Sequence, residues 1–186
     1  ICHEHIEFYS IQSLKYLFEN NGLEIFKISE NDINGGSYRI YCRKIKNGSI
    51  KLKNENVLKL MQGFVKRIKE NKNKIRNFIL GKIKENKKIF LYGASTKGNT
   101  VLQYYKLSKK EIPFAAERSP EKWGKYTIGS GIKIISEDKA RKLNPHYFFV
   151  TPWGFIKEFV KREKKWMKKG GSFILPFPKF KIIKLK

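Results

Sequence analysis

Three ionisable side chains stand in a row near the start of the chain, at His3, Glu4 and His5. On an extended strand, His3 and His5 point to the same side, which is the arrangement of a metal-binding pair, and Glu7 lies on that side too. One histidine could instead act as a general base, with the adjacent Glu4 carboxylate orienting it or tuning its charge. A pair of surface histidines is the third interpretation, and spacing alone does not decide among them.

A second polar group follows a short apolar run. Residues 92–100 read Tyr-Gly-Ala-Ser-Thr-Lys-Gly-Asn-Thr and lie between the run at 89–91 and a helical pattern. Glycines at such a strand-to-helix turn let the backbone approach a ligand, and they leave the first helical amides available to an anion. We therefore expect ligand binding through Ser95, Lys97 and Asn99 rather than a plain tight turn.

This loop is close to two phosphate-binding signatures and matches neither. Asn99 stands where a nucleoside-triphosphate loop needs lysine, which argues against nucleotide hydrolysis. Ser95 stands where the dinucleotide fingerprint needs another glycine. Glu117 ends the next expected strand, where an acidic residue would bond a ribose hydroxyl. A nicotinamide-dependent oxidoreductase is therefore an alternative that Glu117 favours and the missing glycine weakens.

The composition and charge of the chain limit the classes of binding partner that we expect. The net charge of +25 comes mostly from lysines spread along the whole chain, whereas a dedicated nucleic-acid binder shows arginine, local clusters and stacking aromatics. We expect weak attraction of polyanions and no specific nucleic acid, although the same field favours a phosphorylated substrate. No apolar run approaches the roughly 20 residues of a membrane span, so no membrane partner is expected. Cys2 and Cys42 form neither a disulfide framework nor a zinc site, which favours the cytoplasm.

The first part of the chain predicts an incomplete unit. Residues 10–22 have one apolar stripe and a stop at Asn21-Gly22, which is typical of a helix. Strands are expected at 23–28 and 38–42, with a turn at Gly35-Gly36. Two strands and one helix do not bury both faces of a sheet, so residues 1–45 should belong to a larger domain.

A helical segment connects this part to the rest. Apolar residues recur at helical spacing from 54 to 86, and the polar interval 70–74 divides them into two helices. We therefore expect residues 46–86 to form a helical linker folded as a hairpin, with a solvated lysine face.

The last part, residues 87–186, alternates between strands and helices, which predicts an α/β fold with a Rossmann-like parallel sheet and flanking helices. The most prominent helix is a long amphipathic one at 153–169. Ligands of such sheets bind at the carboxyl ends of the strands. Three polar segments fall at expected strand ends, namely 93–99, Glu117-Arg118 and Pro152-Trp153.

Taken together, five ordered motifs resemble one family, the sugar C-methyltransferases, which use S-adenosylmethionine on nucleotide-linked keto-sugars. The motifs are His3-Glu4-His5 with Phe8-Tyr9-Ser10, the segment 34–39, the glycine loop 92–100, the segment 117–126, and Thr151-Pro152-Trp153. The resemblance implies that residues 1–45 are the terminal helix and strand pair of a class I methyltransferase domain. It also implies that a preceding region holds S-adenosylmethionine and a zinc-binding domain, and that residues 1–186 alone do not methylate.

The resemblance also implies roles for individual residues. His5 corresponds to the family's base, with Glu4 beside it, and an unperturbed histidine pKa of about 6.5 suits removal of a proton next to a ketone. The resulting enolate attacks the donor methyl group. The expected contacts to the nucleotide-linked sugar come from His3, Tyr9, Gly35, Gly36, Ser95, Lys97, Asn99, Glu117, Arg118 and Trp153. Cys2 departs from the family, which usually has tyrosine there. That departure is the only support for a catalytically inactive nucleotide-binding module.

Overall fold

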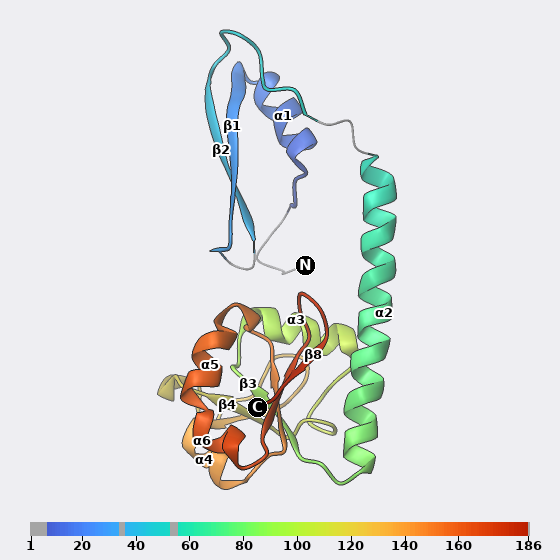
Figure 1. The fold of residues 1–186 in the computed structure, drawn as a ribbon, viewed down its shortest axis with the longest axis vertical. Helices are drawn as coiled ribbons and strands as arrows, with labels where there is room; N and C mark the ends of the chain where they lie inside the picture. Colours follow the sequence, from blue (N-terminus) through green and yellow to red (C-terminus); the bar gives the residue numbers. More distant parts are fainter. Residues whose placement is uncertain (1–6, 34–35, 53–55, 186) are drawn as a thin grey trace. The chain divides into compact units, whose positions relative to one another are not determined.

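A computed structural model of the chain describes residues 7–33, 36–52 and 56–185 (Figure 1). Its internal contacts divide these residues into two compact units, and the division falls between Val65 and Lys66. Units defined by contacts differ from domains defined by homology. The expected domain boundaries after residues 45 and 86 therefore stay predictions.

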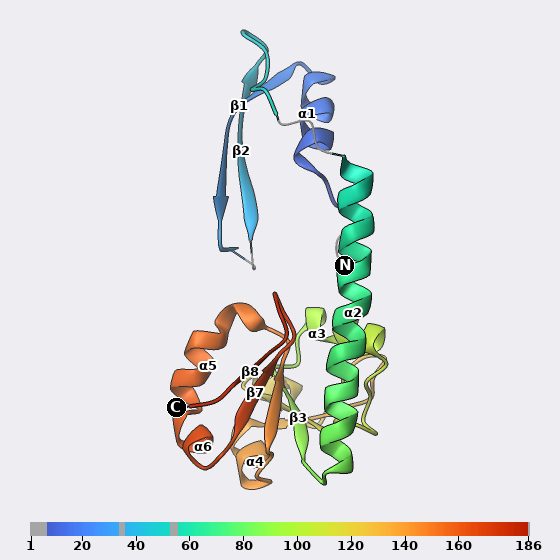
Figure 2. The same cartoon turned by 45° about the vertical axis from the view of Figure 1, so that its right-hand side comes forward.

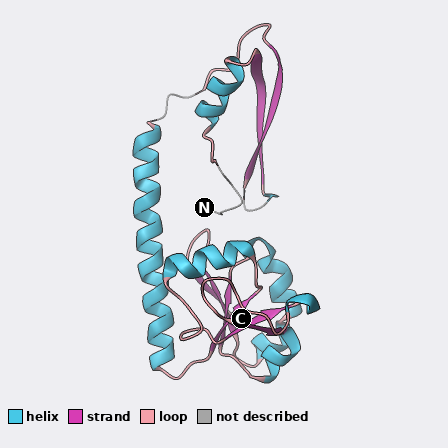
Figure 3. Cartoon of the chain, turned by 180° about the vertical axis from the view of Figure 1, so that it is seen from behind, coloured by secondary structure: helices cyan, strands magenta, loops and turns pink. Residues whose placement is uncertain are grey.

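The first unit contains an antiparallel strand pair and a helix that packs beside it (Figure 3). Helix α1 (Ile11–Glu19) begins where the Ser10 hydroxyl accepts a hydrogen bond from the Ser13 N–H. Strands β1 (Leu23–Asn31) and β2 (Ser37–Lys44) pair along their whole length, with α1 packed beside β1. The predicted helix and strand pair are confirmed as elements.

A buried carboxylate accepts hydrogen bonds at the end of the strand pair where β1 begins and β2 ends. Glu24 is fully buried, and its Oε1 accepts a hydrogen bond from Arg43 Nε at 2.6 Å. Its Oε2 accepts the N–H groups of Lys46 and Asn47 at 3.0 and 2.9 Å. Burial by itself would raise the pKa of Glu24, but these donors outweigh it and lower the pKa to about 2.

The expected helical hairpin is wrong, because α2 (Val57–Lys84) is one continuous helix (Figure 2). The polar interval 70–74 does not turn the chain, since its side chains have partners in the C-terminal unit. The Asn71 amide donates to the Tyr105 hydroxyl at 3.1 Å and to the Pro176 carbonyl at 3.0 Å. Within the described ranges, neither α2 nor any other helix has the length and apolarity needed to cross a membrane.

The C-terminal unit contains a six-stranded sheet in the order β5-β4-β3-β6-β7-β8. The first five strands in this order are parallel, and β8 pairs antiparallel with β7 at the edge. The predicted α/β fold with a Rossmann-like parallel sheet is thereby confirmed. The strands are β3 (Ile89–Tyr92), β4 (Phe114–Glu117), β5 (Lys133–Ser136), β6 (Tyr147–Val150), β7 (Ser172–Leu175) and β8 (Lys181–Ile183).

Helices cover both faces of this sheet (Figure 2). The second half of α2 and helix α3 (Thr96–Tyr105) pack on one face through side chains such as Ile79 and Leu102. Helices α4 (Glu137–Lys142), α5 (Ile156–Arg162) and α6 (Lys164–Lys168) cover the other. The apolar strands are buried on both faces because each face has its own helical layer.

The expected single helix at 153–169 is also wrong. Residues Trp153–Phe155 form a short 3-10 turn, and α5 and α6 are separated at Glu163, whose backbone has φ −93° and ψ 14°. Glu163 is 1% exposed and is held by Arg141 and Tyr92. These contacts turn the Glu163 side chain inward, and the helix bends at this residue.

Candidate functional site at the switch point of the sheet

The order of the strands reverses direction beside β3. From β3 the chain goes to β4 on one side, whereas β6 lies on the other side. Ligands of open α/β sheets bind in the crevice outside the carboxyl ends of the strands at such a point. An open groove of about 350 Å³ lies there. It is lined by Tyr92, Gly93, Ala94, Ser95, Ala116, Glu117, Arg118, Lys122, Glu137, Pro152, Phe155, Glu158, Phe159 and Arg162.

The glycine loop follows β3 and forms one wall of this groove. Gly93 has φ +83°, and a Cβ atom added there would lie 2.9 Å from Pro152 Cγ. A Cβ atom on Gly98 would lie 2.6 Å from Thr151 Oγ1. Both glycines are therefore required, one for its backbone conformation and the other for the close approach of α3 to the end of β6.

Ser95 begins helix α3. Its hydroxyl accepts the Gly98 N–H at 3.1 Å, and its carbonyl accepts the Asn99 N–H at 3.1 Å. The N–H groups of Thr96 and Lys97 lie in the first helical turn, where no helical carbonyl precedes them to accept a bond. Together with the helix dipole, these donors favour an anion at this end of α3.

Lys97 and Trp153 lie next to each other beside this helix end. The Lys97 ammonium is 5.9 Å from the centre of the Trp153 indole, and the indole centre is 4.9 Å from that of Phe177. Trp153 contributes to this cluster and not to the lining of the groove. The structure thus brings Lys97 and Trp153 together beside the helix that Ser95 begins.

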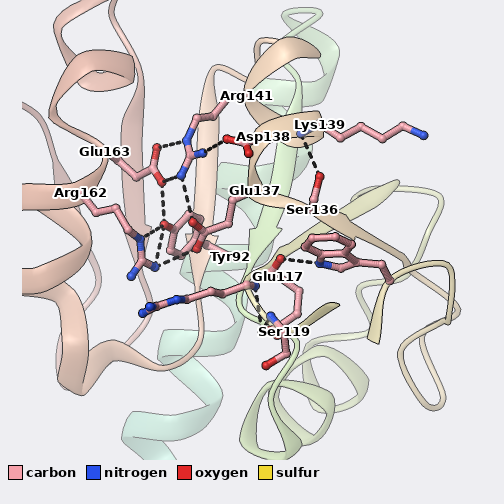
Figure 4. A network of polar contacts seen from close by, with 12 residues as sticks. Tyr92, Glu117, Ser119, Ser136, Glu137, Asp138, Lys139, Arg141, Arg162 and Glu163 are labelled. Carbon is pink, nitrogen blue, oxygen red and sulfur yellow. Dashed lines mark hydrogen bonds and ion pairs between the residues drawn. The ribbon is translucent and has the colours of Figure 1, made fainter. Parts of the chain in front are cut away.

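Glu117 lies at the end of β4, and its carboxylate is occupied by the chain itself. Its Oε2 accepts the Ala94 N–H at 2.8 Å, and its Oε1 accepts the N–H groups of Arg118 and Ser119 at 2.9 and 3.1 Å. The ammonium of Lys122 is 3.7 Å from Oε2. Figure 4 shows Glu117 and Ser119 at this edge of the sheet.

Arg118 follows directly and is exposed at the groove. Within the described ranges its guanidinium has no hydrogen bond or ion pair, in contrast to the neighbouring Lys122 and Arg162. A guanidinium presents a planar set of donors that matches carboxylate and phosphate groups. Arg118 is therefore placed to bind an anionic ligand.

A polar network that the sequence analysis missed contributes Tyr92, Glu137 and Arg162 to the lining of the groove (Figure 4). The Tyr92 hydroxyl donates to Glu163 Oε1 at 2.7 Å and accepts from Arg162 at 2.9 Å. Arg141 donates to both Glu163 oxygens, and Glu137 accepts from Arg141 and Arg162. Burial, followed by the Glu163 hydrogen bond, raises the pKa of Tyr92 strongly, so this hydroxyl stays protonated.

Two of the expected contact residues, Tyr9 and Gly36, lie in the described part of the first unit. Tyr9 is half exposed and donates its hydroxyl to Glu7, which raises the pKa of Tyr9. Gly36 lines a cavity of about 460 Å³ at the tip of the strand pair, together with Glu30, Asn31, Asp32, Ser37 and Tyr38. The remaining expected residues, His3, Glu4, His5 and Gly35, lie outside the described residues.

Metal ligands are a separate question. Among residues 7–33, 36–52 and 56–185 there is no group of three or more His, Cys, Asp or Glu side chains that could hold a metal ion. The His3–His5 pair lies outside these ranges, so the structure does not decide between the metal-binding, general-base and surface interpretations of the pair.

Comparison with known proteins assigns the family. A family model described as the C-methyltransferase C-terminal domain matches residues 32–178. The chain belongs to this family. It is also 28% identical over 195 residues to the C-methyltransferase NovU of Streptomyces niveus.

The alignment with NovU includes 98% of this chain and 46% of NovU, so the chain spans about half the length of this relative. The family match includes the glycine loop, Glu117-Arg118 and Trp153. The groove at the switch point is therefore a feature of a C-methyltransferase C-terminal domain.

Proposed function

We propose that this chain acts as the C-terminal part of an S-adenosylmethionine-dependent C-methyltransferase whose substrate is a nucleotide-linked keto-deoxysugar. The observation that carries the proposal is the groove at the switch point of a C-methyltransferase C-terminal domain. In this proposal the groove holds the nucleotide diphosphate part of the substrate.

The groove and the end of α3 beside it have chemical features that support a nucleotide diphosphate. The first N–H groups of α3 and the ammonium of Lys97 favour phosphate oxygens. Arg118 adds a guanidinium that no described side chain neutralises. Phe155 is exposed and lines the same groove, so a planar base has an apolar surface to pack on. A charged group and a planar group on one ligand match this arrangement.

The transfer step is assigned by the resemblance. His5 takes the proton from the carbon next to the sugar ketone, and Glu4 beside it favours the protonated imidazole that forms. The enolate carbon then forms a bond to the methyl carbon, and the methyl–sulfur bond breaks. S-adenosylmethionine supplies that methyl group and leaves as S-adenosylhomocysteine. The donor and the zinc domain belong to the region that precedes this chain in the proposal.

Arg118 gives a direct test of the proposed nucleotide groove. Arg118→Ala should weaken binding of thymidine diphosphate or uridine diphosphate by about tenfold, because one charged hydrogen bond to a phosphate contributes roughly that much. Isothermal titration of the chain with each diphosphate, at fixed salt, measures the effect.

The control is Lys110→Ala, which removes one exposed positive charge outside the groove. This variant should bind both diphosphates as the wild type does. Equal affinity for wild type and Arg118→Ala, or equal losses in both variants, would contradict the groove as the nucleotide site.

A further inference from the structure

In the glycine loop, both the backbone N–H and the backbone carbonyl of Ala94 are hydrogen-bonded by side chains. The Ala94 N–H donates to Glu117 Oε2 at 2.8 Å, and the Ala94 carbonyl accepts from Lys122 Nζ at 3.2 Å. Glu117 and Lys122 also form an ion pair with each other. Ala94 lies between Gly93, which has a left-handed backbone, and Ser95, which begins α3. Its position therefore sets where the amides of the helix point.

The segment that carries these two side chains is itself tied to the sheet. The Gly93 N–H donates to the Ala116 carbonyl at 2.8 Å, and the Trp123 indole N–H donates to the Glu117 carbonyl at 2.8 Å. These bonds hold Glu117 in place before any ligand is present. The bonds from Glu117 and Lys122 to Ala94, called the clamp below, are thus part of the folded unit.

Most of the acceptor capacity of the Glu117 carboxylate is used within the chain. A carboxylate offers about four lone-pair sites. Three backbone N–H groups bond it at 2.8, 2.9 and 3.1 Å, and the Lys122 ammonium faces it at 3.7 Å. The Glu117 side chain is 11% exposed. A ribose hydroxyl that approached it would have to use the one remaining acceptor site, which the Lys122 ammonium faces.

From these contacts we propose that Glu117 and Lys122 are positioning residues that clamp the glycine loop, and that Glu117 does not read the ribose. This inference rests on the proposed function, since it concerns the nucleotide held in the same groove. In dinucleotide-binding folds, the acidic residue at this strand end bonds the ribose hydroxyl. In this chain the Glu117 carboxylate at that position bonds the glycine loop instead. The site should therefore not distinguish ribonucleotides from 2′-deoxyribonucleotides through this carboxylate.

The test compares two ligands that differ only in the 2′-hydroxyl, uridine diphosphate and 2′-deoxyuridine diphosphate. Both are titrated into wild type, Glu117→Gln, Lys122→Ala, Lys122→Arg and the control Lys110→Ala. Hydrogen exchange of the Ala94 amide is measured in the same proteins without ligand, with the Leu102 amide in the core as the internal reference.

We expect the two diphosphates to bind the wild type with the same affinity within about threefold, since in this proposal Glu117 does not bond the 2′-hydroxyl. Glu117→Gln should weaken both by about tenfold and leave their ratio unchanged. This direction is informative because removing a negative charge would by itself strengthen anion binding. Ala94 should exchange faster in this variant while Leu102 stays protected.

Lys122→Arg should retain most of the affinity that Lys122→Ala loses, because an arginine keeps the charge and the donor to the Ala94 carbonyl. Three results would overturn the proposal. One is a preference of more than about tenfold for the ribonucleotide that disappears in Glu117→Gln, as expected of a ribose-reading carboxylate. The others are unchanged Ala94 exchange in Glu117→Gln, or tighter binding in that variant.

The proposed nucleotide site can fail independently. If neither diphosphate binds the wild type, the groove is not a nucleotide site, and the claim about the ribose falls with it. The clamp is then decided by hydrogen exchange alone. Faster exchange at Ala94 in Glu117→Gln supports it, and unchanged exchange overturns it.

Discussion

At Gly98, helix α3 lies close to Thr151, the residue that follows β6. A methyl group added there would lie 2.6 Å from Thr151 Oγ1 and 3.2 Å from Ser95 Oγ. Thr151 is fully buried, so its hydroxyl has little freedom to move aside. The close approach of Gly98 to Thr151 couples α3 to the segment after β6. Substitutions measure its contribution to the free energy of unfolding.

Gly98→Ala should destabilise the protein by about 1–3 kcal/mol, because the added methyl overpacks a closed contact. The double variant Gly98→Ala/Thr151→Ala should recover much of this loss, since it removes the hydroxyl that the methyl meets. Urea unfolding followed by circular dichroism measures both.

Gly81→Ala provides the matched control for this prediction. Gly81 lies within α2, and the space that an alanine methyl would occupy there is open, so alanine should stabilise by roughly 0.5–1 kcal/mol through helix propensity. Equal stability changes in Gly98→Ala and Gly81→Ala would contradict the close approach of α3 to Thr151.

Some site residues could be predicted from the sequence and others could not. Gly93 and Ser95 stand in a local pattern that strand-to-helix turns share. Lys122 and Arg162 have no such pattern, because their partners come from segments distant in the sequence. For Tyr92 the sequence does indicate a buried polar contact, since a tyrosine that ends a buried strand needs a hydrogen-bond partner for its hydroxyl.

At the scale of the elements, Glu163 separates α5 from α6 and joins both to the sheet. Its two carboxylate oxygens accept from Arg141, and one also accepts from the Tyr92 hydroxyl. With 1% of its surface exposed, its carboxylate depends on these partners for the hydrogen bonds that water would otherwise supply. The amphipathic pattern of 153–169 did not reveal this bend, because a hydrophobic period says nothing about a buried ion pair.

Glu163→Gln should destabilise the protein by about 3–5 kcal/mol, the usual effect of breaking a buried ion pair by removing one partner. The exposed Glu158→Gln should change stability by less than about 0.5 kcal/mol. Denaturant unfolding of the three proteins at one pH measures this difference. A loss in Glu163→Gln as small as that in Glu158→Gln would show that the network adds little to stability.

The continuity of α2 was missed for a related reason. A run of polar residues at 70–74 resembles a break when only the local pattern is considered. In the folded protein Asn71 donates to two acceptors from distant segments, and Lys74 lies 5.7 Å from the centre of the Phe180 ring. Tertiary contacts of this kind override weak helix propensity. The strands were easier to predict, because their apolar runs are bounded by turn residues.

The first unit should lose stability in acid because of Glu24. Its pKa is about 2 in the folded chain and about 4.3 when unfolded, so the unfolded state binds the proton more tightly. The contribution of Glu24 is therefore complete above about pH 5 and disappears as the pH falls toward 2.

Glu24→Gln tests this dependence. The variant should be less stable than the wild type at neutral pH, and the difference should shrink as the pH falls from about 5 to about 2. Hydrogen exchange of the β1 amides across this range reports on the unit directly. A difference that stays constant with pH would contradict the ionised, hydrogen-bonded carboxylate.

At the scale of the whole molecule, the charge of +25 acts together with the groove. A positive field attracts phosphorylated ligands and other polyanions alike, and salt screens it. The groove adds hydrogen-bond donors at fixed positions, which the field alone does not provide. Specific binding should therefore survive at salt concentrations that remove the general attraction.

In the proposed function, the chain serves C-methyl transfer to a nucleotide-linked keto-sugar with His5 as the base. The most direct measurement follows methyl transfer from labelled S-adenosylmethionine in the complete enzyme, for wild type and His5→Asn. We predict transfer by the wild type and a loss of at least about 10²-fold in His5→Asn, with nucleotide-sugar binding retained. Transfer at the normal rate by His5→Asn, or no transfer by the wild type, would contradict this assignment.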